Sequence, residues 1–181
     1  MTKLEHRAFL YDDIEQFLMV TVPYLTEGAI AGDVVTAIVQ QPKLDALRDI
    51  LVPEFSDAIM YVETEEFYRH PVHTLKTYHE IIHTNAPRPI RALGEGSWEK
   101  WSPRETVEWT RYESLVNVVF GEARARALCV YDNKRLPPEI IAHARETHPQ
   151  LLDPMLTMIS PGYVDPPVFG RRCDRAAASG R

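Results

Sequence analysis

The sequence predicts an α/β domain built on a mainly parallel, five-stranded sheet with helices on both faces. Short apolar segments alternate along the chain with longer segments of helical periodicity, which is the pattern of repeated strand–helix–strand units. The apolar segments contain few polar positions, as expected for strands that are covered on both faces. The length of 181 residues, with 45% hydrophobic and 25% charged residues, suits one domain with a buried core.

The individual elements follow from these patterns. Apolar runs predict strands over residues 6–11, 34–39, 58–62, 89–93 and 127–131. Helical periodicity predicts helices over residues 13–31, 42–51, 71–84, 103–120 and 137–147. Because each strand is joined to the next by a helix, we expect parallel, right-handed connections.

The helix over residues 103–120 has the most distinct boundaries. Ser102 fits the capping position, Pro103 the first helical position, and Glu105 completes a capping box. Gly121 fits the left-handed backbone conformation that often follows the last helical residue.

Prolines predict a change of organisation near residue 150. We expect residues 1–150 to form the folded domain, and residues 151–181 to form a proline-rich linker and a disordered tail without regular structure. The prolines that mark this change are Pro149, Pro154, Pro161, Pro166 and Pro167.

The charge distribution argues against direct binding to nucleic acid. The net charge is -6, and four arginines against one aspartate give residues 171–181 a charge of +3, which leaves -9 on residues 1–170. An acidic body is a poor surface for phosphate, which supplies most non-specific affinity for nucleic acid.

The sequence also predicts a compartment. It has no secretory signal and no apolar run long enough to span a bilayer, so we expect no membrane association. Cys129 and Cys173 do not form a disulfide framework, and Cys129 falls inside a predicted strand as a small buried hydrophobe. A cytoplasmic location is the simplest interpretation.

An HExxH motif, with His79, Glu80 and His83, is the most conspicuous catalytic pattern. On a helix the two histidines lie one turn apart and can share a zinc ion, with Glu80 as general base. However, the helix ends directly after the motif, and a third ligand would have to be Glu99 or Glu105. A zinc hydrolase is therefore kept as an alternative.

Other catalytic signatures are missing from the sequence. No GxxxxGK[ST] or GxGxxG loop follows a predicted strand, and no GxSxG nucleophile elbow occurs. Asp12, Asp13 and Glu15 would repel a phosphate at the start of the first helix. The sequence thus predicts no enzyme, no cofactor and no bound metal.

Polar and aromatic residues near the predicted strand ends form the candidate ligand site. Ligands of open α/β sheets bind at the carboxyl ends of the strands, and residues four apart on a helix share a face. The predicted site consists of Tyr11, Asp12, Glu63, Gly94, Glu95, Trp109, Glu113, Asn117, Tyr131 and Asp132. The structural alternative places Trp109 in the core, lets Asn117 cap a backbone group and pairs Glu113 with an arginine.

Six ordered segments resemble a known family. They are HRAFLY, PYLTEGAIAGDVVTAIV, RALGEGSW, SPRETVEWTRYESLVNVVF, ALCVYD and ARETHP, and SPGYVDP at 160–166 resembles the linker that often follows. Over residues 4–150 the chain resembles the MEDS domain, the methanogen/methylotroph DcmR sensory domain. The matching positions are His6, Tyr11, Gly94, Glu95, Trp98, Arg111, Glu113, Asn117, Cys129, Tyr131, Asp132, His148 and Pro149.

This resemblance implies a fold and a function. The fold would be related to RecA/KaiC-type ATPases without their phosphate loop. The function would be sensing of small molecules such as hydrocarbon derivatives, in a protein that carries a fused anti-sigma-factor kinase-like or DNA-binding output domain, or that signals to a separate partner.

Three functions remain open on the sequence. The first is a cytoplasmic, non-enzymatic sensory domain that binds an unidentified small molecule and acts on a transcription-regulating protein partner. The second is a protein–protein interaction module, for dimerisation or docking, without a ligand. The third is a zinc hydrolase that uses the HExxH motif.

Overall fold

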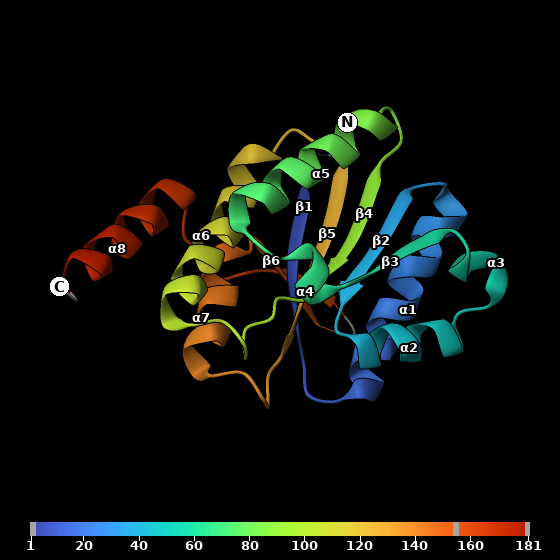
Figure 1. Ribbon diagram of the computed structural model, residues 1–181, viewed down its shortest axis with the longest axis horizontal. Helices are drawn as coiled ribbons and strands as arrows, with labels where there is room; N and C mark the ends of the chain where they lie inside the picture. Colours follow the sequence, from blue (N-terminus) through green and yellow to red (C-terminus); the bar gives the residue numbers. More distant parts are fainter. Residues whose placement is uncertain (1–2, 154–155, 180–181) are drawn as a thin grey trace.

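The computed structural model describes residues 3–153 and 156–179, which contain a mostly parallel seven-stranded sheet (Figure 1). The strands are β1 (Glu5–Tyr11), β2 (Val34–Val39), β3 (Ile59–Glu63), β4 (Ile90–Gly94), β5 (Ala125–Asp132), β6 (Gln150–Asp153) and β7 (Leu156–Ile159). Their order is β3-β2-β4-β5-β1-β6-β7, and β7 is antiparallel to β6 whereas the other pairs are parallel. The first strand of the chain therefore lies inside the sheet.

The prediction of five strands is wrong, because the segment after residue 149 adds β6 and β7 to the sheet. Both strands have four residues, which is too short for an apolar periodicity to be recognised. Pro149 precedes β6, where the missing amide leaves the strand's pairing with β1 intact. The expected absence of regular structure after residue 150 is therefore also wrong, whereas the division of the chain into a domain and a linker stays a prediction.

The helices predicted from periodicity are present with shifts of one residue or less at each end. The helices are α1 (Ile14–Ala31), α2 (Gln41–Ile50), α3 (Pro53–Ser56), α4 (Thr64–Phe67), α5 (Pro71–Asn85), α6 (Pro103–Val119), α7 (Pro138–Thr147) and α8 (Pro166–Ser179). The sequence did not predict α3 and α4, which have four residues each, or α8, which packs on α6 and α7. In Figure 1 α8 extends away from the sheet at the C-terminal end.

The expected capping box at the start of α6 is confirmed, whereas the left-handed glycine expected after its end is not. The Ser102 hydroxyl accepts a bond from the Glu105 amide, and the Glu105 carboxylate accepts one from the Ser102 amide, so the capping box is complete. Gly121, however, does not adopt the left-handed conformation. Among the described residues the positive-φ position belongs to Gly32, at the end of α1.

Helices cover both faces of the sheet, as predicted. α1 and α2 bury Phe17, Leu25 and Leu47 against one face. α6 and α7 bury Tyr112 and Ile140 against the other, and α5 packs there as well. We call these the α1 face and the α6 face.

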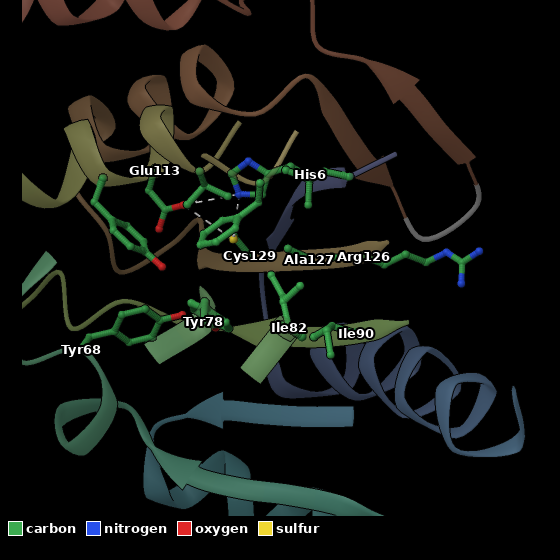
Figure 2. Close-up of a pocket in the computed structure, with 16 residues that line it drawn as sticks. His6, Tyr68, Tyr78, Ile82, Ile90, Glu113, Arg126, Ala127 and Cys129 are labelled. Atoms are coloured by element: carbon green, nitrogen blue, oxygen red, sulfur yellow. Dashed lines mark hydrogen bonds and ion pairs between the residues drawn. The ribbon is translucent and has the colours of Figure 1, made fainter. Parts of the chain in front are cut away.

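Strand pleating decides which face each side chain enters. In β1, Phe9 and Tyr11 belong to the core of the α1 face, whereas Ala8 belongs to the core of the α6 face. Because successive side chains alternate, His6 points to the α6 face with Ala8. The same alternation sends Cys129 of β5 to the α6 face (Figure 2).

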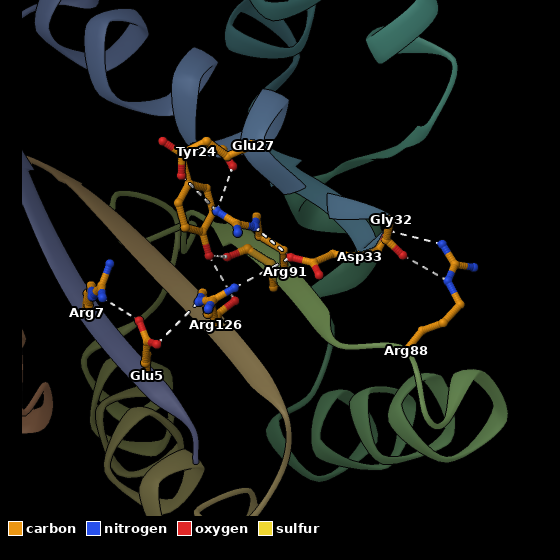
Figure 3. Close-up of polar contacts among 10 residues, drawn as sticks. Glu5, Arg7, Tyr24, Glu27, Gly32, Asp33, Arg88, Arg91 and Arg126 are labelled. Atoms are coloured by element: carbon orange, nitrogen blue, oxygen red, sulfur yellow. Dashed lines mark hydrogen bonds and ion pairs between the residues drawn. The ribbon is translucent and has the colours of Figure 1, made fainter. Parts of the chain in front are cut away.

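A buried arginine, Arg91, lies on the α1 face (Figure 3). Arg91 Nε donates to Asp33 Oδ2 at 3.0 Å, and Nη1 donates to the Tyr24 carbonyl at 3.1 Å. The guanidinium also lies 5.0 Å from the centre of the Tyr24 ring, and Glu27 Oε2 is 3.5 Å away. This charge is thus matched by a carboxylate, a carbonyl and an aromatic face, as a stable buried ion pair requires.

Among residues 3–153 and 156–179, none of the helices combines the length and the apolar character needed to cross a lipid bilayer.

Candidate functional site

Four side chains with metal-ligating atoms meet on the α6 face; we call them the His–Glu–Cys cluster. Its members are His6, Glu113, Cys129 and His148. One ligand atom of each lies within 4.8 Å of the ligand atoms of the other three. Figure 2 shows His6, Glu113 and Cys129 pointing toward one another.

Two neighbouring strands and two helices of the α6 face bring these residues together. β1 and β5 are parallel neighbours, and His6 pairs with Ala127, two residues before Cys129 on the same face. Glu113 comes down from the buried side of α6. His148 ends α7, directly before the chain turns into β6. His6 and His148 are thus the first and the last residues of the cluster along the chain.

Four distances between ligand atoms of the cluster have similar lengths. His6 Nε2 lies 3.4 Å from Cys129 Sγ and 3.5 Å from Glu113 Oε2. Glu113 Oε2 lies 3.8 Å from Cys129 Sγ and 3.6 Å from His148 Nε2. The Glu113 oxygen therefore faces the other three ligand atoms.

Hydrogen bonds fix the tautomer of both histidines. The Asn117 amide nitrogen donates to the Thr147 carbonyl at 2.7 Å, so its oxygen accepts from His6 Nδ1 at 3.0 Å. His148 Nδ1 donates to the Ala144 carbonyl at 2.8 Å. Because Nδ1 donates to an oxygen in both rings, Nε2 is the nitrogen that each ring presents to the cluster.

Burial shifts the pKa values of two residues of the cluster, His148 and Cys129. It lowers the pKa of His148 well below its usual value, with a further contribution from His6. It raises the pKa of the Cys129 thiol, with a further contribution from the Glu113 carboxylate. A neutral imidazole and a protonated thiol are thus the resting forms, unlike the thiolate of a catalytic cysteine.

An apolar cavity of about 40 Å³ lies beside the cluster; we call it the aromatic pocket. His6, Glu113 and Cys129 form its polar wall. Its remaining walls are mainly aromatic and aliphatic, and include Tyr68, Tyr78, Ile82, Tyr112, Val116 and Phe120 (Figure 2). At Gly94 a Cβ would lie 2.5 Å from the Tyr68 hydroxyl, so a glycine is needed there for this wall to close.

A second cavity, of about 280 Å³, lies at the carboxyl ends of the strands; we call it the edge pocket. Tyr11, Lys43 and Asp132 line it. Beneath it, the Tyr11 hydroxyl donates to Glu95 at 3.0 Å and Lys43 Nζ donates to the same oxygen at 2.6 Å. Burial and the Glu95 carboxylate both raise the pKa of Tyr11, which therefore stays a donor.

Comparison with known families identifies the fold unit that holds these features. The model of the MEDS family, the methanogen/methylotroph DcmR sensory domain, matches residues 5–149. The chain belongs to the MEDS family. This match includes all four residues of the His–Glu–Cys cluster, and it places the chain in a family of sensory domains.

Structural comparison extends the likeness at the level of the fold. The MEDS chain is similar to the PH0250 protein of Pyrococcus horikoshii OT3, with a TM-score of 0.56 and 10% sequence identity. The similarity covers 90% of this chain and 92% of the other. No curated protein matches the sequence. The expected relation to RecA/KaiC-type ATPases stays a prediction.

Three residues of the predicted site lie at the aromatic pocket or the cluster of the MEDS chain. Glu113 is a member of the cluster, and Gly94 lines the pocket. Asn117 orients His6 from one turn further along α6. Glu113 thus faces histidines and a thiol rather than the arginine that the structural alternative expected.

Four further residues of the predicted site lie at the carboxyl edge of the sheet. Tyr11 and Glu95 form the buried group beneath the edge pocket, and Asp132 lines this pocket. Asp12 accepts a hydrogen bond from the Asn133 side chain in the adjoining turn. Ligand binding by these residues stays a prediction.

The remaining predicted site residues have structural contacts. Trp109 stacks on Trp101 with ring centres 4.7 Å apart, as the alternative placement in the core expected. Tyr131 is buried edge-on against His148. Glu63 caps α4 by accepting a bond from the Glu65 amide, and it lines neither pocket.

Sequence reasoning missed three of the four cluster residues as ligands. His6, Cys129 and His148 lie on separate elements, and Cys129 was interpreted as a small hydrophobe. All three are among the positions that carry the resemblance to the MEDS domain, which is the one signal that pointed to them.

The HExxH residues lie elsewhere. His79, Glu80 and His83 are exposed on α5, with the two rings 6.3 Å apart. In the described part of the chain they belong to no group of three metal ligands. Glu99 is bonded to Arg135, and Glu105 is used in the capping box.

Proposed function

We propose that this chain is a non-enzymatic sensory domain that binds a small, largely apolar molecule in the aromatic pocket. The bound molecule would change how the domain acts on a transcription-regulating partner, such as an anti-sigma-factor system. The observation that carries this proposal is the pocket itself, in which apolar walls face a cluster of polar atoms. Apolar cavities with a few fixed polar groups are typical of small-molecule sites.

The size of the pocket limits the ligand. A volume of about 40 Å³ holds about three water-sized groups. This suits a molecule of a few non-hydrogen atoms with an apolar body and one polar end. The polar end would meet His6, Glu113 or Cys129, and the body would contact Tyr112 and Phe120.

α5 is the element best placed to report binding. Tyr78 and Ile82 of this helix line the pocket, yet Thr74 is its one buried residue. Elements with few buried contacts change position at a low free-energy cost. A ligand that prefers one position of α5 would shift its equilibrium and alter the surface offered to a partner.

Straight-chain alcohols from methanol to hexanol test the pocket directly. Thermal unfolding of the purified chain should shift upward for the alcohols that fit, since a ligand that binds the folded state stabilises it. In A92L the added side chain fills the pocket from β4, and this shift should disappear. Arg135 lines the edge pocket and not the aromatic pocket, so in R135Q the shift should persist.

Two outcomes would oppose this assignment. An undiminished shift in A92L together with a lost shift in R135Q would move the ligand to the edge pocket. No shift with any alcohol, and no copurified small molecule in native mass spectrometry, would remove the small-molecule function.

A second candidate function, an interaction module, is favoured by the edge strand β7. It ends the sheet and exposes Leu156, Met158 and Ile159, with Ile159 83% exposed. Apolar edge strands of this kind pair with other chains unless they are covered. Light scattering should then show an oligomer that L156K/I159K converts to a monomer, whereas a monomeric wild type would exclude self-association.

A further inference from the structure

The His–Glu–Cys cluster has the donor set of a transition-metal site. It offers two imidazole nitrogens, one thiol sulfur and one carboxylate oxygen. Zinc binds all three donor types and is usually tetrahedral in proteins. Hard cations such as magnesium and calcium prefer oxygen ligands alone, so this set selects against them.

The spacing of the donor atoms fits such a site. Metal–ligand distances of about 2.0–2.3 Å place the corners of a tetrahedron about 3.3–3.8 Å apart. Four of the six distances among His6 Nε2, Cys129 Sγ, Glu113 Oε2 and His148 Nε2 run from 3.4 to 3.8 Å. The ligand atoms of the cluster all lie within 4.8 Å of one another. An ion at their centre would therefore need little movement of the side chains.

The hydrogen bonds around the cluster point the donors inward. Asn117 accepts from Nδ1 of His6, and the Ala144 carbonyl accepts from Nδ1 of His148. Metal-binding histidines are held in this way, with the second ring nitrogen donating to a carbonyl or amide oxygen. Both Nε2 lone pairs are thus directed at the same point.

One ligand atom of the cluster makes no hydrogen bond in the described part of the chain. His148 Nε2 is fully buried and makes no hydrogen bond there, and the side chain is 0% exposed. A buried polar atom without a partner lowers stability, so natural proteins rarely keep one. A bound cation would satisfy this atom.

We infer that His6, Glu113, Cys129 and His148 bind one divalent transition-metal ion, with zinc as the best-matched ion. The site lies on the polar wall of the aromatic pocket, because His6, Glu113 and Cys129 also line that pocket. Metal binding does not depend on the proposed sensory function. If that function holds, the ion would also anchor the polar end of the small molecule, and this last step rests on it.

Zinc titration of the chelator-treated full chain tests the site. Native mass spectrometry should show one zinc per chain. C129S and E113Q should each weaken zinc binding by more than about 100-fold, since each loses a direct ligand. H79A/H83A and C173S serve as controls and should bind as the wild type does, because these residues lie outside the cluster.

Cobalt gives an independent spectroscopic result. With Cys129 as a ligand, Co²⁺ should give the sulfur-to-cobalt charge-transfer absorption and the visible bands of a tetrahedral site. These bands should be lost in C129S and retained in C173S. An octahedral, sulfur-free spectrum in the wild type would overturn the inference.

Thiol alkylation avoids the risk that a buried variant fails to fold. In the wild type, zinc should slow modification of Cys129 and leave Cys173 unaffected. Equal rates with and without zinc, or zinc binding lost in H79A/H83A and kept in C129S, would refute the site.

The alcohol experiment separates the two proposals. Repeated on zinc-free and zinc-loaded protein, it should give a larger thermal shift in the loaded form. Zinc binding without any alcohol effect would leave the metal site standing and remove the sensory ligand. Equal alcohol shifts in both forms would keep the ligand and remove its anchoring by the ion.

Discussion

The two faces of the sheet bury polar groups in opposite ways. On the α1 face, Arg91 is matched by Asp33, the Tyr24 carbonyl and the Tyr24 ring. On the α6 face, the His–Glu–Cys cluster directs lone pairs at one point, and His148 Nε2 makes no hydrogen bond among the described residues. The first arrangement is complete by itself, and the second becomes complete when a cation is added.

This difference shows that burial of charged or titratable residues does not mark a functional site. Arg91 and Asp33 are buried, and so are the histidines of the cluster. What separates them is the pairing of donors with acceptors, because a saturated group leaves nothing for a ligand to bind. Experiments that break either arrangement should therefore affect different properties.

The largest effect on stability is expected from R91L. This change leaves Asp33 buried with one distant cation, Arg126 Nη1 at 3.8 Å. Loss of one partner of a buried ion pair lowers the free energy of unfolding by about 3–5 kcal/mol. Urea denaturation measures this loss, and R104A, in an exposed pair, should change it by less than about 1 kcal/mol. A loss in R91L as small as in R104A would contradict the structural role.

Zinc should stabilise the protein by binding to the cluster on the α6 face. At a free concentration 100 times its dissociation constant, zinc should raise the free energy of unfolding by about 2.7 kcal/mol. The same increment is expected in R104A and should vanish in C129S. Denaturation with and without zinc measures it, and an equal increment in C129S would mean that zinc binds elsewhere.

N117A should separate orientation from ligation. The change removes the acceptor that holds His6 Nδ1 and leaves all four ligands in place. Loss of such a supporting hydrogen bond weakens metal binding by about 10–100-fold. Competition with a chelating dye measures the affinity. N133A, an asparagine bonded to Asp12 in a turn, is the control and should leave the affinity unchanged.

G28A should give the smallest effect, on the α1 face. A Cβ at this buried position of α1 would lie 2.5 Å from Arg91 Cδ and 2.9 Å from Val35 Cγ2. Overpacking lowers stability by about 1–3 kcal/mol, against a gain of about 1 kcal/mol in helix propensity. Urea denaturation should show a net loss in the free energy of unfolding. A stabilised variant would mean that the Arg91 side chain moves aside without a cost in stability.

The sequence predicted local structure well because local signals encode it. The capping box of Ser102 and Glu105 defined the start of α6, and apolar runs defined β1 to β5. β6 and β7 were missed, since short strands next to prolines carry no periodicity, and α8 was missed because its prolines and small residues were interpreted as a disordered tail. The end of α6 was placed within one residue, but the left-handed conformation expected at Gly121 is absent, because a glycine permits that conformation without requiring it.

The candidate site was predicted in part for the same reason. Glu113 and Asn117 were found because they lie four apart on one helix. His6 and Cys129 meet through the pairing of β1 with β5, which no spacing along the chain reveals. The HExxH motif attracted attention because its histidines are close in sequence, yet the ligands that converge are distant in sequence.

The position of β1 within the sheet has a consequence for folding during synthesis. This strand is made before the other strands of the sheet, whereas its neighbours β5 and β6 are made last among the parallel strands. Contacts of such high sequence separation form slowly, and a nascent chain holds its first strand without a partner until they appear. His6 can reach His148 only after that insertion. The cluster would therefore assemble only after β1 has inserted between β5 and β6. A bound metal ion would then indicate that the sheet is complete.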